Sequence, residues 1–334
     1  MKLKYLIVKG CAGIGNRLYT ITRAMEIAKL QNRILVVDWS DGQFAPKNVN
    51  AFYHFFDIKD FPHAKHLPDI APLSVYPKIW KTEINNSIYD VFYVVEPVLN
   101  IFKKLPFTLL RVLKIKKLHG FWISTTIAEK KTLSWFLKNM VSSNTFPNGE
   151  YYYQNKKEDV LVYVEFFPPF NEELFLNHIS LKNKFLQKVN VFCAKYNVSE
   201  KFIGVHIRST DKKPKKEVNR LLQYLMNDKL KNSFIFLATD NIEVQEKFNE
   251  VFGNRLILYP KFLPNTDGDG LHQYALYKKD ESMMLQITEE SLMDMWILSR
   301  CETLYYQGNS TFSHIAKALH TNKSKCIDWF NLNI

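Results

Sequence analysis

The 334-residue sequence has few cysteines, and they are far apart. Its four cysteines are Cys11, Cys193, Cys301 and Cys326. These separations fit neither a disulfide framework nor the paired spacing of a zinc site. We therefore expect a reducing, cytoplasmic environment and no bound metal.

The sequence also lacks long hydrophobic runs. No segment approaches the roughly 20 apolar residues of a transmembrane helix, and the apolar run at 5–8 is too short for a signal peptide. Any membrane contact is expected to be peripheral. Segment 103–117 favours such contact with an anionic membrane, because it holds six cations and no acids among interleaved apolar residues. The same pattern also fits a helix that covers the core.

What the chain does contain is a folded composition with a basic surface. Hydrophobic residues make up 46% and aromatic residues 14% of the sequence, while 45 Lys and Arg oppose 33 Asp and Glu, a formal charge of +12. The length suggests two domains, which we place at 1–197 and 198–334. The charge favours anionic ligands, but no zinc finger or RNA-recognition signature is present, so nucleic acid is not an expected partner.

The first forty residues predict a strand–helix–strand unit of a parallel sheet. A strand is expected at 5–8, a glycine-rich turn at 10–17, a helix to about residue 31 and a second strand at 34–39. The glycines are spaced G-x-x-G-x-G, which is not the dinucleotide-binding fingerprint. Either the turn packs tightly for structural reasons, or its backbone N–H groups and Arg17 face an anion.

The second half predicts a doubly wound α/β sheet. Buried strands are expected at 202–207, 233–238, 256–259 and 303–306, and helices at 182–196, 221–227, 242–252, 289–299 (with Thr288 as N-cap) and 314–319.

Three of these strands run directly into polar turns. Arg208, Asp240 and the turn 308–313 each follow a predicted strand. Because open α/β sheets bind ligands beyond the carboxyl ends of their strands, we expect the three turns to meet. A forked arginine beside free N–H groups at a helix start suits a pyrophosphate. Taken singly, each turn is equally compatible with a solvated loop.

Asp294 interrupts an apolar helix. It is flanked by Leu292, Met293, Met295 and Trp296, and a buried carboxylate is costly unless it is paired. It either lies on the wet face of the helix or accepts from the paired N–H donors of guanine, which would select guanine over adenine.

Several short motifs together resemble the GDP-fucose-dependent fucosyltransferases, a superfamily with α1,2, α1,6 and protein O-fucosyl branches. The motifs lie at 13–16, 206–212, 238–241, 292–296 and 310–313, and those at 38–39 and 50–52 are additionally similar to the rhizobial nodulation-factor α1,6-fucosyltransferase. The resemblance covers residues 1–57 and 200–320.

This resemblance implies an α/β, GT-B-like fold with two Rossmann-like domains facing across a cleft, the second of which holds the donor. The implied activity is an inverting, metal-independent glycosyltransferase without a cofactor. It would move fucose from GDP-fucose to a hydroxyl of a glycan acceptor, which we expect in cell-surface polysaccharide or lipopolysaccharide biosynthesis.

The resemblance also assigns site residues. Arg208 would bind the β-phosphate, and the other donor-binding residues would be Gly13, Gly15, Asn16, Arg17, His206, Lys212, Asp240, Asp294, Ser310, Thr311 and Ser313. Many relatives have two consecutive arginines where this chain has Arg208 and Ser209, so one phosphate contact is either absent or supplied by Lys212 or Arg17. Glu217 and Asp211 are the candidates for the catalytic base.

Two alternatives remain open on the residues alone. One is a glycosyltransferase of the same architecture that uses another nucleotide sugar. The other is a non-catalytic polyanion-binding protein, which the charge of +12 would favour.

Overall fold

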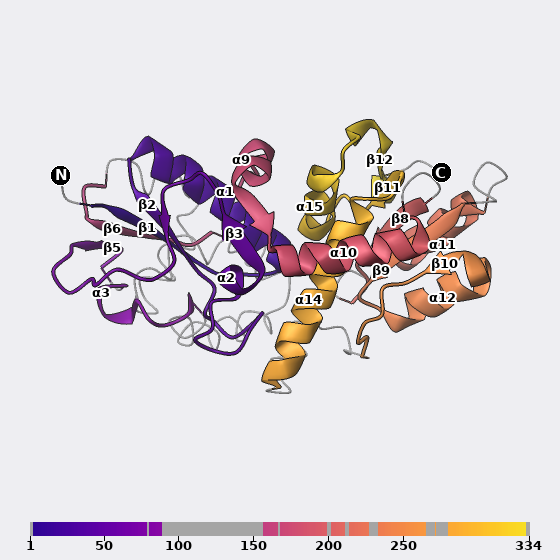
Figure 1. Ribbon diagram of the computed structural model, residues 1–334, viewed down its shortest axis with the longest axis horizontal. Coiled ribbons are helices and arrows are strands. Elements are labelled where there is room, and N and C mark those ends of the chain that lie inside the picture. Colours follow the sequence, from indigo (N-terminus) through magenta and orange to yellow (C-terminus); the bar gives the residue numbers. More distant parts are fainter. Residues whose placement is uncertain are drawn as a thin grey trace, which may run out of the picture. The chain divides into compact units, whose positions relative to one another are not determined.

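The computed structural model describes residues 3–78, 80–88, 156–165, 168–198, 202–210, 214–226, 233–264, 271 and 280–331 (Figure 1). By contacts the chain divides into two compact units. Unit 1 comprises 1–12, 16–41 and 58–178, and unit 2 comprises 13–15, 42–57 and 179–334. These bounds are interleaved and differ from the predicted division after residue 197. Two short segments from the start of the chain are therefore part of unit 2.

Unit 1 is built on a parallel sheet, as its first forty residues predict. The strands, in spatial order, are β4 (His63–Ala64), β2 (Ile34–Asp38), β1 (Tyr5–Lys9), β6 (Val160–Tyr163) and β5 (Val75–Tyr76). Helix α1 (Ile14–Leu30) joins β1 to β2, and α3 (Trp80–Glu83) and α9 (Glu172–His178) complete the described helices. Strands β1, β2 and β6 are buried along almost their whole length and are therefore mostly apolar, although β1 ends in Lys9 and β2 ends in Asp38.

Unit 2 is built on a second parallel sheet. Its strands, in spatial order, are β10 (Leu256–Ile257), β9 (Phe234–Thr239), β8 (Phe202–Ile207), β11 (Thr303–Tyr306) and β12 (Cys326–Asp328). If these five strands are numbered by their order in the chain, their spatial order is 3-2-1-4-5. The direction of winding therefore reverses between β8 and β11. In doubly wound sheets, ligands bind at such a switch point.

The helices of unit 2 are α2 (Ala51–Phe55), α10 (Asn183–Tyr196), α11 (Lys215–Leu225), α12 (Ile242–Phe252), α14 (Glu281–Leu298) and α15 (Thr311–Leu319). Short 3₁₀ turns occupy Gly253–Arg255, Lys323–Lys325 and Trp329–Asn331, and β3 (Phe56–Ile58) pairs with β7 (Ile179–Leu181). Alternating helices and parallel strands confirm the predicted α/β class.

The start of helix α14 was predicted wrongly. Helix α14 begins at Glu281, and the carboxylate of Asp280 caps it by accepting from the Met283 N–H (3.0 Å). Thr288 lies inside the helix, where its hydroxyl is 2.7 Å from the Met284 carbonyl and 3.0 Å from that of Phe44. The prediction failed because a threonine followed by two acids looks like a cap, while the true cap lies two turns earlier.

Some expectations fall outside the described residues, among them the basic segment 103–117, Asp211 and Lys212. Within the described ranges, no helix is long and apolar enough to cross a membrane. The four cysteines are free, and no group of three or more His, Cys, Asp or Glu side chains in the same ranges could hold a metal ion.

Candidate functional site

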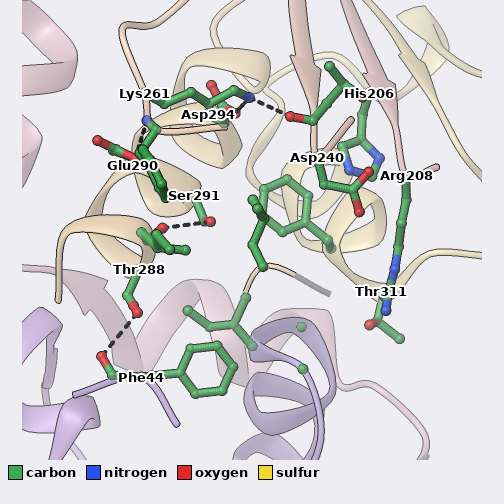
Figure 2. Close-up of a pocket in the computed structure, with 18 residues that line it drawn as sticks. Phe44, His206, Arg208, Asp240, Lys261, Thr288, Glu290, Ser291, Asp294 and Thr311 are labelled. Atoms are coloured by element: carbon green, nitrogen blue, oxygen red, sulfur yellow. Dashed lines mark hydrogen bonds and ion pairs between the residues drawn. The ribbon is translucent and has the colours of Figure 1, made fainter. Parts of the chain in front are cut away.

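A pocket of about 920 Å³, its open mouth included, is lined entirely by residues of unit 2 (Figure 2). It brings together residues from each of the three predicted turns, and its lining includes the predicted site residues Gly13, Gly15, His206, Arg208, Asp240, Asp294 and Thr311. The carboxyl ends of β8 and β9 are part of its wall, as expected for a doubly wound sheet.

The turn that carries Arg208 is held from two sides. The Arg208 N–H donates to Oε1 of Gln307 (2.7 Å). Asp240 accepts from the Ser209 N–H (2.7 Å) at one oxygen and from the Thr210 hydroxyl (2.6 Å) at the other. Both Asp240 oxygens are therefore used within the protein, and this carboxylate positions the arginine turn.

Gln307 links this turn to the next strand, and no sequence motif points to it. It is fully buried at the end of β11, and its Nε2 donates to Oδ1 of Asn309 (2.8 Å). Its own N–H donates to the Ser313 hydroxyl oxygen (3.1 Å). A buried amide with both ends bonded fixes the spacing between the arginine turn and the turn before α15.

Helix α15 begins at an N-cap residue whose side chain is unsatisfied. Ser310 is its N-cap residue, yet its side chain makes no capping bond, and its buried Oγ has no partner among the described residues. Thr311, the first residue of α15, lines the pocket. The N–H groups of a first helical turn have no partner within the helix, so this end of the pocket can receive an anion.

Gly15 makes the close approach of another segment to α15 possible. A Cβ atom at this position would lie 2.6 Å from the Thr311 carbonyl carbon and 2.7 Å from the Phe312 nitrogen. Both neighbours are backbone atoms, so no side chain larger than hydrogen fits unless the start of α15 moves.

His206 is buried and neutral. Its ring stacks on Phe312, with ring centres 4.8 Å apart, and its Nδ1 bonds the Ser313 hydroxyl. Burial lowers the pKa of His206 to about 3, and the positive charges of Arg208 and Lys261 add to this effect. The Ser313 oxygen also accepts from the Gln307 N–H, so Ser313 links His206 to the end of β11.

Asp294 is buried and paired, and its partner was not anticipated. Nζ of Lys261 lies 2.5 Å from Oδ2, and each side chain is 6% exposed. Oδ1 has no partner among the described residues. Burial raises the pKa of Asp294, and the Lys261 ammonium opposes that rise. Both side chains line the pocket and lie together at one end of it (Figure 2).

Other predicted site residues do not line the pocket. Arg17 is buried in unit 1, where it bonds Asp41 (2.5 Å) and the Ala12 carbonyl (2.9 Å), and Asn16 is also buried in that unit. Ser310 and Ser313 are buried and are not part of the pocket lining. Glu217 lies in the first turn of α11, 4.0 Å from the Arg220 guanidinium.

The chain matches no protein-family model and no curated protein in sequence. Its fold is similar to solved structures of the NodZ alpha-1,6-fucosyltransferase. One, soaked with GDP-fucose, has a TM-score of 0.59 at 18% identity and covers 96% of this chain and 93% of that chain. Another, NodZ from Bradyrhizobium, has a TM-score of 0.59 at 18% identity, with 96% and 94% covered. The predicted resemblance to the fucosyltransferases therefore extends to the fold of nearly the whole chain.

Proposed function

We propose that this protein is a glycosyltransferase that moves fucose from GDP-fucose to a hydroxyl of a glycan acceptor. The observation that carries the proposal is one pocket at the switch point of a parallel sheet, with Arg208 and the start of α15 at one end and Asp294 at the other (Figure 2). NodZ, whose fold is similar, was soaked with GDP-fucose in one structure and co-crystallised with GDP in another. A nucleoside diphosphate has matching chemistry, an anionic end and a polar base.

The arginine end suits the pyrophosphate. Arg208 supplies a forked cation, and the start of α15 supplies neutral N–H donors together with the unpartnered hydroxyl of Ser310. Gln307 and Asp240 hold the two turns in place. Such fixed donors stabilise charge that grows on a leaving phosphate, because they need no rearrangement during the reaction.

The opposite end suits guanine. Asp294 carries a carboxylate with an unused oxygen, and guanine presents adjacent N–H donors where adenine presents an acceptor. The apolar side chains of Phe44, Ile287 and Phe312 also line the pocket and offer surfaces for a flat ring.

The architecture that we propose is GT-B-like, with residues 198–334 as the nucleotide-sugar domain and residues 1–197 as the acceptor-side domain. In an inverting transfer, an oxygen of the acceptor attacks the anomeric carbon of fucose while the bond from that carbon to the β-phosphate oxygen breaks. The bonding electrons leave with GDP, and the acceptor proton passes to a base. Glu217 and Asp211 remain the candidates for that base.

The acceptor that we propose is a glycan of cell-surface polysaccharide or lipopolysaccharide biosynthesis, reached from the cytoplasm. Contact with an anionic membrane through 103–117 is part of this proposal. Liposome co-sedimentation of a protein with Lys103, Lys104, Lys116 and Lys117 replaced by Glu would test it, and unchanged binding would refute it.

Donor choice is tested by thermal unfolding with GDP, ADP and UDP, followed by turnover of GDP-fucose against a glycan panel with and without EDTA. We expect GDP alone to raise the melting temperature and EDTA to leave turnover unchanged. Stabilisation by UDP but not GDP would instead indicate another nucleotide sugar. Salt-sensitive binding of oligonucleotides without any nucleotide effect would indicate a polyanion-binding protein.

A further inference from the structure

We propose that Lys261 and Asp294 recognise the base as a donor–acceptor pair, with the Lys261 ammonium donating to the base oxygen beside the N–H groups that Asp294 accepts. This inference deepens the proposed function and rests on it. Lys261 follows β10, and Asp294 lies in α14, 33 residues further along the chain.

The bonding capacity of Lys261 is only partly used. An ammonium group has three N–H donors. One bonds Oδ2 of Asp294 (2.5 Å), and another bonds the Thr239 carbonyl (2.6 Å). Among the described residues the third has no acceptor, and Lys261 lines the pocket. The lysine is thus anchored at two points with one donor left.

Asp294 complements it. Oδ2 accepts from Lys261 and Oδ1 accepts from no described group. A buried carboxylate oxygen without a donor is unfavourable, and a ligand with an N–H group removes that cost. One donor and one acceptor therefore lie side by side at the same end of the pocket (Figure 2).

Guanine matches this order of groups. Its six-membered ring presents an acceptor oxygen, then the N1–H donor, then an amino donor. Adenine presents the reverse at the first two positions, an amino donor and then an acceptor nitrogen, so it would oppose donor to donor at Lys261 and acceptor to acceptor at Asp294. Mismatched buried groups lose their bonds with water without replacing them, which makes discrimination large.

Lys261 also keeps Asp294 able to accept. Burial raises the pKa of Asp294, and the lysine opposes the rise. Without Lys261, the Asp294 carboxyl would be protonated at a higher pH and would no longer accept from the N–H groups of guanine. GDP affinity would then depend on pH, with recovery as the pH rises.

The test is calorimetric titration of GDP, IDP and ADP into the full-length protein and the Lys261→Met variant at several pH values. For Lys261→Met we expect GDP affinity to fall about 10- to 100-fold at pH 7, as a lost charged hydrogen bond implies, and to recover partly at pH 8, where the N1–H of the base is still present. ADP affinity should not fall. IDP, which keeps the oxygen and N1–H, should lose affinity in parallel with GDP.

The matched control is Lys188→Met, which removes the exposed ion pair with Glu289 in the same unit and should leave all three affinities unchanged. If Lys261→Met does not fold, Lys261→Met/Asp294→Asn removes both charges together and should bind GDP and ADP with similar affinity.

The outcomes separate this inference from the proposed function. If the wild-type protein does not bind GDP, the proposed function fails. If the wild type binds GDP and Lys261→Met binds it equally tightly, or with a loss that does not depend on pH, the inference fails alone. A double variant that still prefers GDP to ADP as strongly as the wild type would also overturn it.

Discussion

The two units have similar sheets but differ in how their buried polar groups are satisfied. In unit 1, Lys9 ends β1 beside Asp38 at the end of β2. The two side chains pair at 2.5 Å, and the lysine also donates to the carbonyls of Ile84 and Asn86. Each of its three donors therefore has an acceptor within the protein.

Unit 2 instead leaves two buried polar atoms without partners among the described residues, one inside α14 and one at the N-cap of α15. They are Oδ1 of Asp294 and Oγ of Ser310, and Asp294 lines the pocket. In unit 1 the indole nitrogen of Trp80 also has no described partner, but Trp80 is packed in the core beneath Lys9. The satisfied pair of Lys9 and Asp38 stabilises the fold. The unsatisfied Oδ1 of Asp294, whose side chain lines the pocket, is instead available to bind a ligand.

The largest effect is expected when the satisfied pair is broken. Lys9→Met leaves the buried Asp38 carboxylate without its cation, so the free energy of unfolding should fall by about 3–5 kcal/mol. GDP affinity of the folded protein should not change. Urea unfolding and GDP titration measure the two quantities.

The control is Lys325→Met, which removes an exposed pair with Glu302 and should change stability by less than about 1 kcal/mol. A Lys9→Met protein with normal stability but weakened GDP binding would reverse the comparison between the units.

Next in size is the loss of Arg208. Arg208→Ala should lower GDP-fucose turnover by about 10² to 10³-fold, because a fixed donor to the leaving phosphate is lost. Urea unfolding should be unaffected. The exposed Arg300 offers a control in the same unit, since Arg300→Ala should turn over normally. Wild-type turnover by Arg208→Ala would refute the phosphate end of the pocket.

A smaller effect is expected in the pH dependence of stability. His206 has a folded pKa of about 3, below its value of about 6.5 in the unfolded chain. As the pH falls, His206 therefore takes up its proton in the unfolded state before it does so in the folded state. Between about pH 6.5 and pH 3 this difference lowers the free energy of unfolding by up to about 1.4 kcal/mol per pH unit.

His206→Gln has no such proton to bind, so its free energy of unfolding should fall less steeply between pH 7 and pH 5 than that of the wild type. The exposed His66 provides the comparison, because His66→Gln should follow the wild-type curve. Parallel curves for His206→Gln and the wild type would contradict the buried neutral histidine.

The smallest effect separates two buried serines. Ser310→Ala removes a hydroxyl with no partner, so GDP affinity should fall up to about tenfold, as one hydrogen bond implies, without loss of stability in the free protein. Ser299 is buried too, but its hydroxyl donates to the Trp296 carbonyl (2.8 Å). Ser299→Ala should show the opposite result, lower stability with normal GDP affinity. If both variants changed stability and GDP affinity in the same way, the proposed difference between Ser310 and Ser299 would be refuted.

The strands and the position of the site could be predicted because their signals are local. A buried strand is a continuous apolar run, and β8, β9 and β11 were found within one or two residues of their ends. Asp294 could be selected from the sequence because it is a charged residue within an apolar helical segment. Helix α11 begins at Lys215, six residues before the prediction, because its lysine-rich first turn has no apolar repeat.

The partners of the site residues could not be predicted because they are distant in sequence. Lys261 is 33 residues from Asp294, and Gln307 is 99 residues from Arg208. No spacing rule connects such pairs. Arg17 was misassigned for the same reason. Its place beside a glycine-rich turn suggested an anion site, but its guanidinium bonds the carboxylate of Asp41, 24 residues away.

The contact of Gly15 with the start of α15 also has a consequence for biosynthesis. Residues 13–15 and Phe44 emerge from the ribosome long before Thr311. The pocket wall that they form together can close only after the long stretch between them has also been released. Unit 1 precedes α15 in the sequence and can begin to fold before α15 is made, but no nascent chain that ends before α15 can form the complete pocket.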